Sequence, residues 1–412
     1  MPKKSDIEII PTRVPARPSL LEGAVKSYDW GQSGPEAFLP SWLGADPASR
    51  PFWAELWFGG HPGGPSILSG EGTDLAARIA RDPAAALGPS VARRFGGVLP
   101  FLVKLLAVGR PLSIQAHPGV ARAERGFARE EAAGVPLSDP RRTYKDPRPK
   151  PEALIALTTF RALKGFRDPA DVAVKAGDHP ELSFLTSGSL KDRFTAALTM
   201  APEAADRALS AVAARLRARN AREPFGPDRP EHWFLRAEET FCPGPRKDAG
   251  LFSFFLLDLV RLDPGDAFFV APGEAHAYLQ GTAVEVMGNS DNVLRGGLTS
   301  KFVDREGLLD VLRFEPSVGK VIKPEAGVYR TPAEEFEASV AEWGNAGGSD
   351  FSVDGGPALW VPLEGAAEWR SGGEVRPLRP GRALFVPAGT AGRITGEGKG
   401  KAILVRTPGA AR

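Results

Sequence analysis

The sequence predicts a mainly β protein with an α-helical insertion, built from two jelly-roll β-sandwich domains. Turn-forming residues are frequent, with 47 Gly and 39 Pro, and the segments between them are short and rich in Val, Leu and Phe. This texture is typical of antiparallel sandwiches and barrels. A central segment has helical apolar spacing instead, and one turn-strand-turn motif occurs twice along the chain.

Length and composition indicate a soluble globular protein. A chain of 412 residues can form two or three domains. The hydrophobic share of 42% and the charged share of 25% exclude a disordered or collagenous chain. With 52 Lys plus Arg against 50 Asp plus Glu, the net charge of +2 gives no strong field. We therefore expect a small-molecule substrate, no nucleic acid or membrane partner, and a monomer or weak homo-oligomer.

Cysteine usage and the apolar segments indicate a cytoplasmic protein. Cys242 is the single cysteine, so a metal would need His, Glu, Asp or Gln as ligands. The first 19 residues lack the apolar stretch of a signal peptide. The most apolar run, Leu251–Val260, contains Asp258 and has half of the about 20 residues that span a bilayer. We interpret this run as a buried strand.

The helical insertion is predicted over residues 167–245. Pro202 can occupy the first turn of a helix, and the apolar residues after it follow helical spacing: Ala205, Leu209, Val212 and Leu216. A second helix is expected over Val120–Ala133, followed by an irregular surface excursion over Pro136–Pro149. The predicted domains are thus 1–166 with 246–318, the insertion, and a C-terminal β domain over 319–412.

The repeated motif suggests that the two β domains are related. Pro264–His276 aligns without a gap on Pro380–Gly392. In each copy Pro-Gly opens a turn, apolar residues form a strand, and a second Pro/Gly pair forms the next corner. A chance coincidence of two such turns is the alternative. Because Gly392 stands where the first copy has His276, we expect a metal only in the first domain.

Histidine is scarce, so the possible histidine ligands of a metal are His61, His117, His179, His232 and His276. His179 and His232 lie in polar surroundings, and we expect both at the surface. Ser113, Gln115 and His117 alternate along one segment, so they project from one face of a strand. A solvent-facing strand is the alternative, although the preceding run Phe101–Val108 is apolar enough to be buried.

A second polar group is expected around His276–Glu285. Gln280-Gly281 fits a two-residue hairpin turn, which would place His276 opposite Glu285, with Tyr278 on the same face. An exposed cross-strand pair is the alternative. Glu152, at the entrance of an apolar strand, is a further carboxylate that could reach a metal, or else a solvated strand terminus.

The segment Asn289–Lys301 is expected to be a loop that carries Asp291, Arg295 and Lys301. Its two glycines, at 296 and 297, would allow the backbone to approach a ligand closely. Arg and Lys supply donors for a phosphate, a carboxylate or a developing oxyanion. An ordinary charged loop is the alternative.

Together these segments resemble the type I mannose-6-phosphate isomerase family, zinc enzymes of the cupin superfamily. The resemblance covers most of the chain and keeps the order and spacing of the family's motifs: Tyr28–Gly31, Ala54–Trp57 with His61-Pro62, Leu99–Lys104, Pro111–Pro118, Lys150–Glu152, His276–Leu279, Glu285, Ser290–Asn292, Arg295, Leu298-Thr299 and Lys301-Phe302. Gly119 replaces the family's usual aspartate, and the interval from His117 to Glu152 is longer than usual.

The resemblance implies one Zn²⁺ per chain, held by Gln115, His117, Glu152 and His276. It also implies interconversion of mannose 6-phosphate and fructose 6-phosphate in mannose metabolism, through a cis-enediol, with Arg295 as the essential arginine. For the base we favour Glu285, with Asp291 or zinc-bound hydroxide as alternatives. The candidates for substrate binding, which the sequence does not rank, are Lys301, Ser113, Lys150, Lys104 and Tyr278. A non-catalytic sugar-binding cupin and an iron-dependent cupin dioxygenase are the rival hypotheses.

Overall fold

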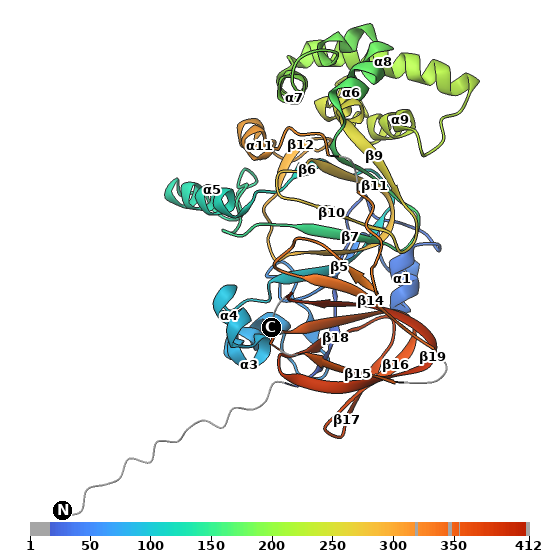
Figure 1. Ribbon diagram of the computed structural model, residues 1–412. Helices are drawn as coiled ribbons and strands as arrows, with labels where there is room; N and C mark the ends of the chain where they lie inside the picture. Colours follow the sequence, from blue (N-terminus) through green and yellow to red (C-terminus); the bar gives the residue numbers. More distant parts are fainter. Residues whose placement is uncertain (1–16, 318–319, 345–347, 354, 409–412) are drawn as a thin grey trace, which may run out of the picture.

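The computed structural model describes residues 17–317, 320–344, 348–353 and 355–408. Two β-rich regions lie one above the other, and a group of helices lies at the end of the molecule away from the C-terminus (Figure 1). Most of the N-terminal segment without an apolar stretch, and the predicted domain boundary at residues 318–319, lie outside the described residues.

The first β region contains the strands that carry most candidate residues. Its main path runs β10-β7-β11-β5-β3-β2, while β6 and β8 also pair with β11, β12 pairs with β6, and β9 pairs with β8. The strands are β2 (Ala24–Lys26), β3 (Glu55–Phe58), β5 (Phe101–Val108), β6 (Ile114–Ala116), β7 (Glu152–Ala156), β8 (Phe160–Phe166), β9 (Leu257–Leu262), β10 (Ala267–Val270), β11 (His276–Gly288) and β12 (Leu294–Gly297). Every residue of β5 is buried, as its apolar sequence predicted.

Strand β11 corrects the predicted hairpin. Residues 276–288 form one continuous strand, and no turn occurs at Gln280-Gly281. The first part pairs with β6 and β8, and the second part pairs with β5 and β7. The register shifts between Tyr278 and Gln280, and Gly281 has a φ of 131°. The Gln-Gly pair therefore forms an irregularity in the strand, because neighbouring strands are available on both sides to pair with it.

The second β region is a sheet in the order β13-β14-β19-β16-β18-β1-β4, with β15 beside β19 and β17 beside β16. Its strands are β1 (Ser19–Glu22), β4 (Ile67–Leu68), β13 (Val328–Tyr329), β14 (Glu337–Trp343), β15 (Gly348–Val353), β16 (Ala358–Ser371), β17 (Glu374–Leu378), β18 (Ala383–Val386) and β19 (Thr390–Arg406). Strands β1 and β4 come from the N-terminal part of the chain, a pairing that the predicted domain ranges did not include.

The two β regions share one hydrophobic core. Leu21 and Phe58 from the N-terminal part pack in the same buried cluster as Val103, Leu359 and Phe385. The repeated motif forms β10 and β18, and each is followed by a turn and a further strand. The two regions are thus packed against each other through this cluster.

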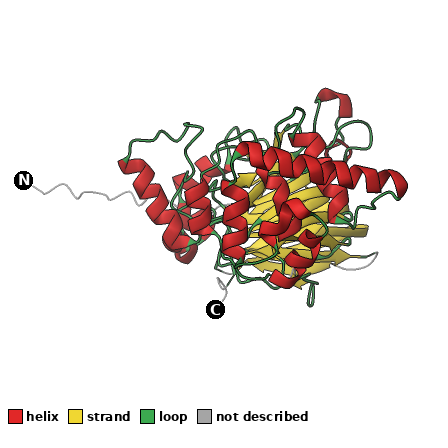
Figure 2. Ribbon diagram, turned by 90° about the horizontal axis from the view of Figure 1, so that it is seen from above, coloured by secondary structure: helices red, strands yellow, loops and turns green. Residues whose placement is uncertain are grey.

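The helical region consists of α6 (Pro169–Gly177), η2 (Pro180–Leu185), α7 (Leu190–Thr199), α8 (Pro202–Arg222) and α9 (Pro230–Phe241). Figure 2 shows helices over one end of the strands. The prediction for His179 was wrong, because its ring is buried against Phe255.

The run Leu251–Val260 also differs from its prediction as a single strand. It forms η3 (Ala249–Phe252), α10 (Ser253–Leu256) and only then β9. Asp248 accepts a hydrogen bond from the backbone N–H of Gly250 at the start of η3. Phe254 and Phe255 then pack edge-on against Phe234 of α9. This tertiary packing against α9 accompanies the helical conformation and overrides the strand propensity of the run.

The remaining helices are α1 (Phe38–Leu43), η1 (Pro47–Ser49), α2 (Leu75–Arg81), α3 (Pro83–Leu87), α4 (Pro89–Arg94), α5 (Val120–Ala132) and α11 (Arg305–Val311). Helix α5 confirms the prediction. The excursion after it is irregular but not wholly at the surface, because Glu130 accepts hydrogen bonds from the backbone of Thr143 and Tyr144, both buried. Within the described ranges, every helix is too short or too polar to cross a membrane.

Candidate metal centre and active site

Three buried side chains converge between the strands of the first β region. His117 follows β6, Glu152 begins β7 and His276 begins β11. Nε2 of His117 lies 3.2 Å from Oε1 of Glu152, and Nε2 of His276 lies 3.5 Å from Oε2 of the same carboxylate. One ligand atom from each residue lies within 4.8 Å of the others. Two imidazoles and a carboxylate in this arrangement can bind a divalent transition metal.

The other nitrogen of each imidazole is already engaged. Nδ1 of His117 lies 2.7 Å from the carbonyl oxygen of Asn292, and Nδ1 of His276 lies 3.2 Å from that of Glu274. Since a carbonyl only accepts, both Nδ1 atoms carry the hydrogen and both Nε2 atoms present a lone pair. Nε2 of His117 is buried and has no hydrogen-bond partner. A metal ion at this point would satisfy it, so the residues present fit such an ion.

The charges around the group keep the ligands in their metal-binding states. Burial opposes ionisation of Glu152, but Lys150, whose Nζ lies 3.0 Å from Oε1, and then His117 hold the pKa of Glu152 well below its usual value. Burial, together with the charge of Lys150, lowers the pKa of His117 to about 4. At neutral pH the carboxylate is therefore charged and this imidazole is neutral, as metal ligation requires.

Gln115 joins the group through strand pairing. It lies opposite His276 on β11 and opposite Arg295 on β12. Directly opposed residues project from the same face, so these three side chains form a row across adjacent strands. The side-chain amide of Gln115 donates to Oγ of Ser113 at 3.1 Å, which leaves its carbonyl oxygen available as a ligand.

Arg295 was expected in a loop, and the structure places it on β12 instead. The glycines beside it do not admit a ligand as predicted: a Cβ at Gly297 would lie 2.6 Å from the backbone of Gly250, and one at Gly296 would lie 3.1 Å from Leu308. The strand forms because β6 offers a free edge. The guanidinium of Arg295 forms no ion pair with any residue of the described ranges.

A second buried charge cluster adjoins the metal group. Lys104 of β5 lies opposite Trp57 of β3 and opposite Glu285 of β11. Its Nζ is 3.0 Å from Oε2 of Glu285, and the hydroxyl of Tyr278 is 2.9 Å from Oε1 of Glu285 and 2.9 Å from Oε2 of Glu152. Burial, and then the charge of Glu152, raise the pKa of Glu285 despite the opposing effect of Lys104. Glu285 is therefore a stronger base than an exposed carboxylate.

These side chains surround a cavity of about 60 Å³, which Glu55 also lines. The indole of Trp57 donates to Glu55 at 2.5 Å. Glu55 was not named as a candidate from the sequence, and His61 was named only as one of the five histidines. Nε2 of the buried His61 lies 3.4 Å from Oδ1 of Asp291. The motif around Glu55 was visible in the sequence, but only the pairing of β3 with β5 brings Glu55 beside Lys104 at this cavity.

Lys301 is exposed and lies in the segment after β12, the strand that carries Arg295. Burial, followed by repulsion from Arg295, lowers the pKa of Lys301, while Glu55 raises it. Neither Lys301 nor Arg295 forms an ion pair with a residue in the described part of the chain.

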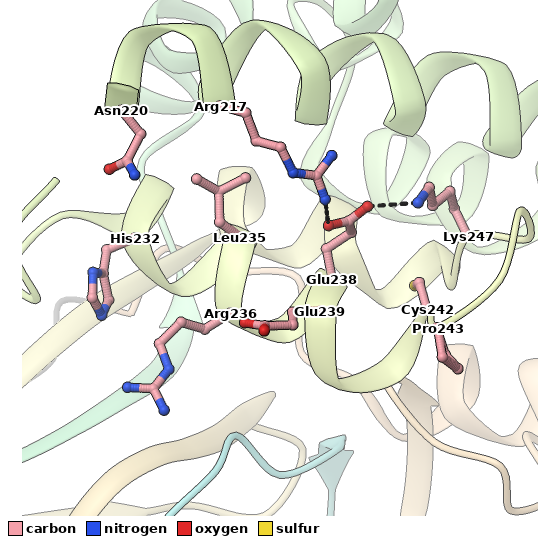
Figure 3. Close-up of a pocket in the computed structure, with 10 residues that line it drawn as sticks. All are labelled: Arg217, Asn220, His232, Leu235, Arg236, Glu238, Glu239, Cys242, Pro243 and Lys247. Carbon is pink, nitrogen blue, oxygen red and sulfur yellow. Dashed lines mark hydrogen bonds and ion pairs between the residues drawn. The ribbon is translucent and has the colours of Figure 1, made fainter. Parts of the chain in front are cut away.

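A larger cavity, of about 670 Å³, lies in the helical region between α8 and α9 (Figure 3). Its buried carboxylate, Glu238, is paired with Arg217 and with Lys247, whose Nζ lies 2.5 Å away (Figure 3). Both oxygens of Glu238 are therefore occupied. The smaller cavity among the strands is lined by Glu152 and His276 of the metal group and by Glu285, whose pKa is raised.

The fold and this site were compared with known proteins. A model of the family "Phosphomannose isomerase type I, catalytic domain" matches residues 19–169. Mannose-6-phosphate isomerase of Salmonella typhimurium is 37% identical over 386 residues, covering 89% of this chain and 94% of its own. That of Escherichia coli K12 is 35% identical over 398 residues, covering 92% and 97%. A crystal structure of mannose 6-phosphate isomerase bound with zinc and yttrium has a TM-score of 0.83 at 35% identity, covering 95% of this chain and 100% of that one.

The β-sandwich fold and the buried His-Glu-His group define a cupin-type protein with a metal-binding site. Similarity to the relatives extends over nearly the full length of both chains. The chain belongs to the type I mannose-6-phosphate isomerase family.

Proposed function

We propose that this chain catalyses the reversible interconversion of mannose 6-phosphate and fructose 6-phosphate with one zinc ion. The observation that carries the proposal is the unpartnered Nε2 of His117, which faces Glu152 beside the buried Lys104–Glu285 pair. Gln115, His117, Glu152 and His276 would hold the zinc. When bound, zinc supplies Lewis-acid stabilisation for an oxygen of the sugar.

Glu285 is the proposed base. It takes the proton from C2 of open-chain mannose 6-phosphate, which leaves an enediolate with its negative charge on O1. A proton moves from the O2 hydroxyl to O1 by way of the cis-enediol, and Glu285 returns its proton to C1 to give fructose 6-phosphate. The raised pKa of Glu285 favours acceptance of the proton, and Lys104 stabilises the carboxylate before the transfer. Asp291 is the alternative base. Burial raises the pKa of Asp291, but the hydrogen bond and the charge of His61 lower it and the net shift is downward, so Asp291 is a weaker base than an ordinary carboxylate.

Arg295 and Lys301 are the proposed partners of the phosphate and of the developing negative charge. Both lack a protein counter-ion among the described residues, whereas Lys104 and Lys150 each lie 3.0 Å from a carboxylate. Ser113 already accepts a hydrogen bond from Gln115. These contacts favour Arg295 and Lys301 over Lys104, Lys150 and Ser113 for the phosphate.

The test is a coupled assay that measures fructose 6-phosphate formed from mannose 6-phosphate, before chelation, after chelation, and after zinc is returned. We expect activity to disappear with the metal and to be restored by zinc. Absence of isomerase activity in the zinc-loaded chain would exclude the proposal and favour a sugar-binding module. Iron rather than zinc in the purified protein, found by elemental analysis, would favour the dioxygenase hypothesis.

A further inference from the structure

Asn292 contacts the proposed zinc ligand His117 and also the segment of chain that leads to the proposed ligand Glu152. It is fully buried at the end of the segment 290–292, which precedes β12. Its backbone carbonyl accepts the hydrogen bond from Nδ1 of His117 at 2.7 Å. This contact fixes the tautomer and the plane of the imidazole, so the position of the Asn292 carbonyl decides where Nε2 of His117 points.

The side chain of Asn292 holds the end of the irregular segment that leads to Glu152. Its Oδ1 accepts from the backbone N–H of Lys145 at 2.7 Å. Its Nδ2 donates to the carbonyl oxygens of Asp146 at 2.7 Å and Arg148 at 2.8 Å. The amide is thus bonded on both ends to a stretch of chain without helix or strand.

Neighbouring groups reinforce the same connection. The carboxylate of Asp146 accepts from the backbone N–H of Asp291 at 2.9 Å and from the hydroxyl of Ser290 at 3.1 Å. Segments 145–148 and 290–292 are therefore joined by a set of hydrogen bonds centred on Asn292. Lys150 and Glu152 follow the first segment directly, so its position limits the position of a proposed zinc ligand.

From this geometry we propose that Asn292 is a positioning residue that sets the zinc affinity of the site, an inference that rests on the proposed zinc function. Through its carbonyl it orients His117, and through its amide it fixes the approach of the chain to Glu152. The hydrogen bonds compensate for the long irregular connection between these two ligands. Loss of the amide should loosen that connection and misplace both ligands, without removal of any ligand atom.

The experiment measures zinc affinity by competition with a chromophoric chelator, in the full chain and in Asn292→Ala. We expect the Kd for zinc to rise about 10- to 100-fold, the usual effect of losing an outer partner of a metal ligand. The visible spectrum of the Co²⁺-substituted variant should also change, because it reports the arrangement of the ligands. A residue that contributes only to folding would leave that spectrum as in the parent.

Asn289→Ala is the matched control. Asn289 is a buried asparagine three positions away, and its amide donates to the carbonyl of Leu99 at 2.9 Å without contact to a ligand. We expect its Kd for zinc and its Co²⁺ spectrum to match those of the parent. If Asn292→Ala does not fold, Ser290→Ala removes one hydroxyl from the same connection and should raise the Kd in the same direction by a smaller factor.

Parent-like zinc affinity and Co²⁺ spectrum in folded Asn292→Ala, or in Ser290→Ala if only that variant folds, would overturn the proposal while leaving the proposed function intact. An equal rise in Kd in Asn289→Ala would overturn it too, because the effect would then follow from any buried amide. A parent chain that binds no zinc would overturn both the proposed function and this inference.

Discussion

At the scale of single residues, the hydroxyl of Tyr278 lies between two carboxylates. It is 2.9 Å from Glu152 and 2.9 Å from Glu285, but it has one proton and can donate to only one of them at a time. Burial, and then the charges of Glu152 and Glu285, raise the pKa of Tyr278 well above its usual value, so the proton is retained. The proposed base and the proposed metal ligand are therefore linked through one hydrogen bond donor.

Replacement of Glu285 by glutamine tests the proposed base. The amide keeps the size of the side chain but cannot take a proton, so kcat should fall by about 10²- to 10⁴-fold. Zinc content should stay at the parent level, because Glu285 lies outside the proposed ligand set. The measurement is kcat together with the exchange of the C2 proton of mannose 6-phosphate with solvent. Exchange at the parent rate would transfer the role to Asp291 or to zinc-bound hydroxide.

Replacement of Arg295 by lysine tests whether the planar guanidinium is needed. Lysine keeps the charge but loses the paired donors that match a phosphate or an enediolate. Because Arg295 lies on a strand opposite Gln115, the backbone should tolerate the change. We expect kcat/KM to fall by at least about tenfold, with thermal stability near that of the parent. A variant with parent-like kcat/KM would show that Arg295 has no specific contact with the substrate.

At the scale of elements, β11 supplies His276, Tyr278 and Glu285 from one strand. Residues 276 and 285 differ by an odd number of positions, so in a regular strand they would project from opposite faces. The register shift between Tyr278 and Gln280 reverses this alternation of faces, so the side chains of His276 and Glu285 both line the cavity. Gly281, directly after the shift, allows the close approach of β8 that follows.

Gly281→Ala should therefore disturb both stability and the site. The φ of 131° is unfavourable for alanine, and a Cβ would lie 2.7 Å from Cδ2 of Phe160. We expect a loss of about 1–3 kcal/mol in the free energy of unfolding, measured with urea. Gly177→Ala is the control: this glycine ends α6, and a Cβ there would meet nothing within 4 Å. Equal stabilities of the two variants would contradict the role of the irregularity in β11.

At the scale of the whole molecule, the second β region differs from the first at the position that corresponds to His276. A Cβ at Gly392 would collide with the ring of Trp369, which is fully buried. The indole thus fills the space that a ligand side chain would need. We predict one zinc per chain in the purified protein and loss of most of it in His276→Ala, measured by elemental analysis. Full zinc occupancy in that variant, or a second ion near Gly392, would contradict the prediction.

Contact between the two β regions should also be visible in the alkaline stability of the protein. The hydroxyl of Tyr329, on β13, donates to the carbonyl of Gly265 in the first region at 3.0 Å. Burial, and then the charge of Asp266, raise the pKa of Tyr329 from 10.0 to about 12. Because the folded pKa is the higher one, this stabilisation is complete below pH 10 and is lost as the pH rises toward about 12.

The measurement is the difference in unfolding free energy between the parent and Tyr329→Phe as a function of pH. That difference should shrink by up to about 3 kcal/mol over the full alkaline range, since one pKa unit corresponds to about 1.4 kcal/mol. The phenylalanine variant, which has no proton to lose, provides the baseline. A difference that stays constant above pH 10 would show that the phenol ionises equally in both states.

The local sequence was sufficient to predict the elements whose residue pattern is compatible with only one type of local structure. The apolar run of β5, the amphipathic α5, the entrance of β7 at Glu152 and the repeated turn-strand motif were predictable, because each depends on side-chain alternation or on turn residues close in sequence. The same alternation placed Gln115 beside His117. The proposed ligand role of Glu152 and the proposed role of Arg295 needed the family resemblance, since nothing local distinguishes these residues from ordinary strand residues.

Tertiary structure alone decided the features that depend on which distant segment offers a partner. Gln280-Gly281 could have closed a hairpin, but β5 and β7 pair with the second half of β11 and keep the strand continuous. Arg295 joined a strand because β6 had a free edge, and residues 251–256 became helical because α9 packs against that turn. Backbone hydrogen bonds and apolar burial are satisfied by whatever lies nearby in space, and that neighbour is not encoded within the short segment itself.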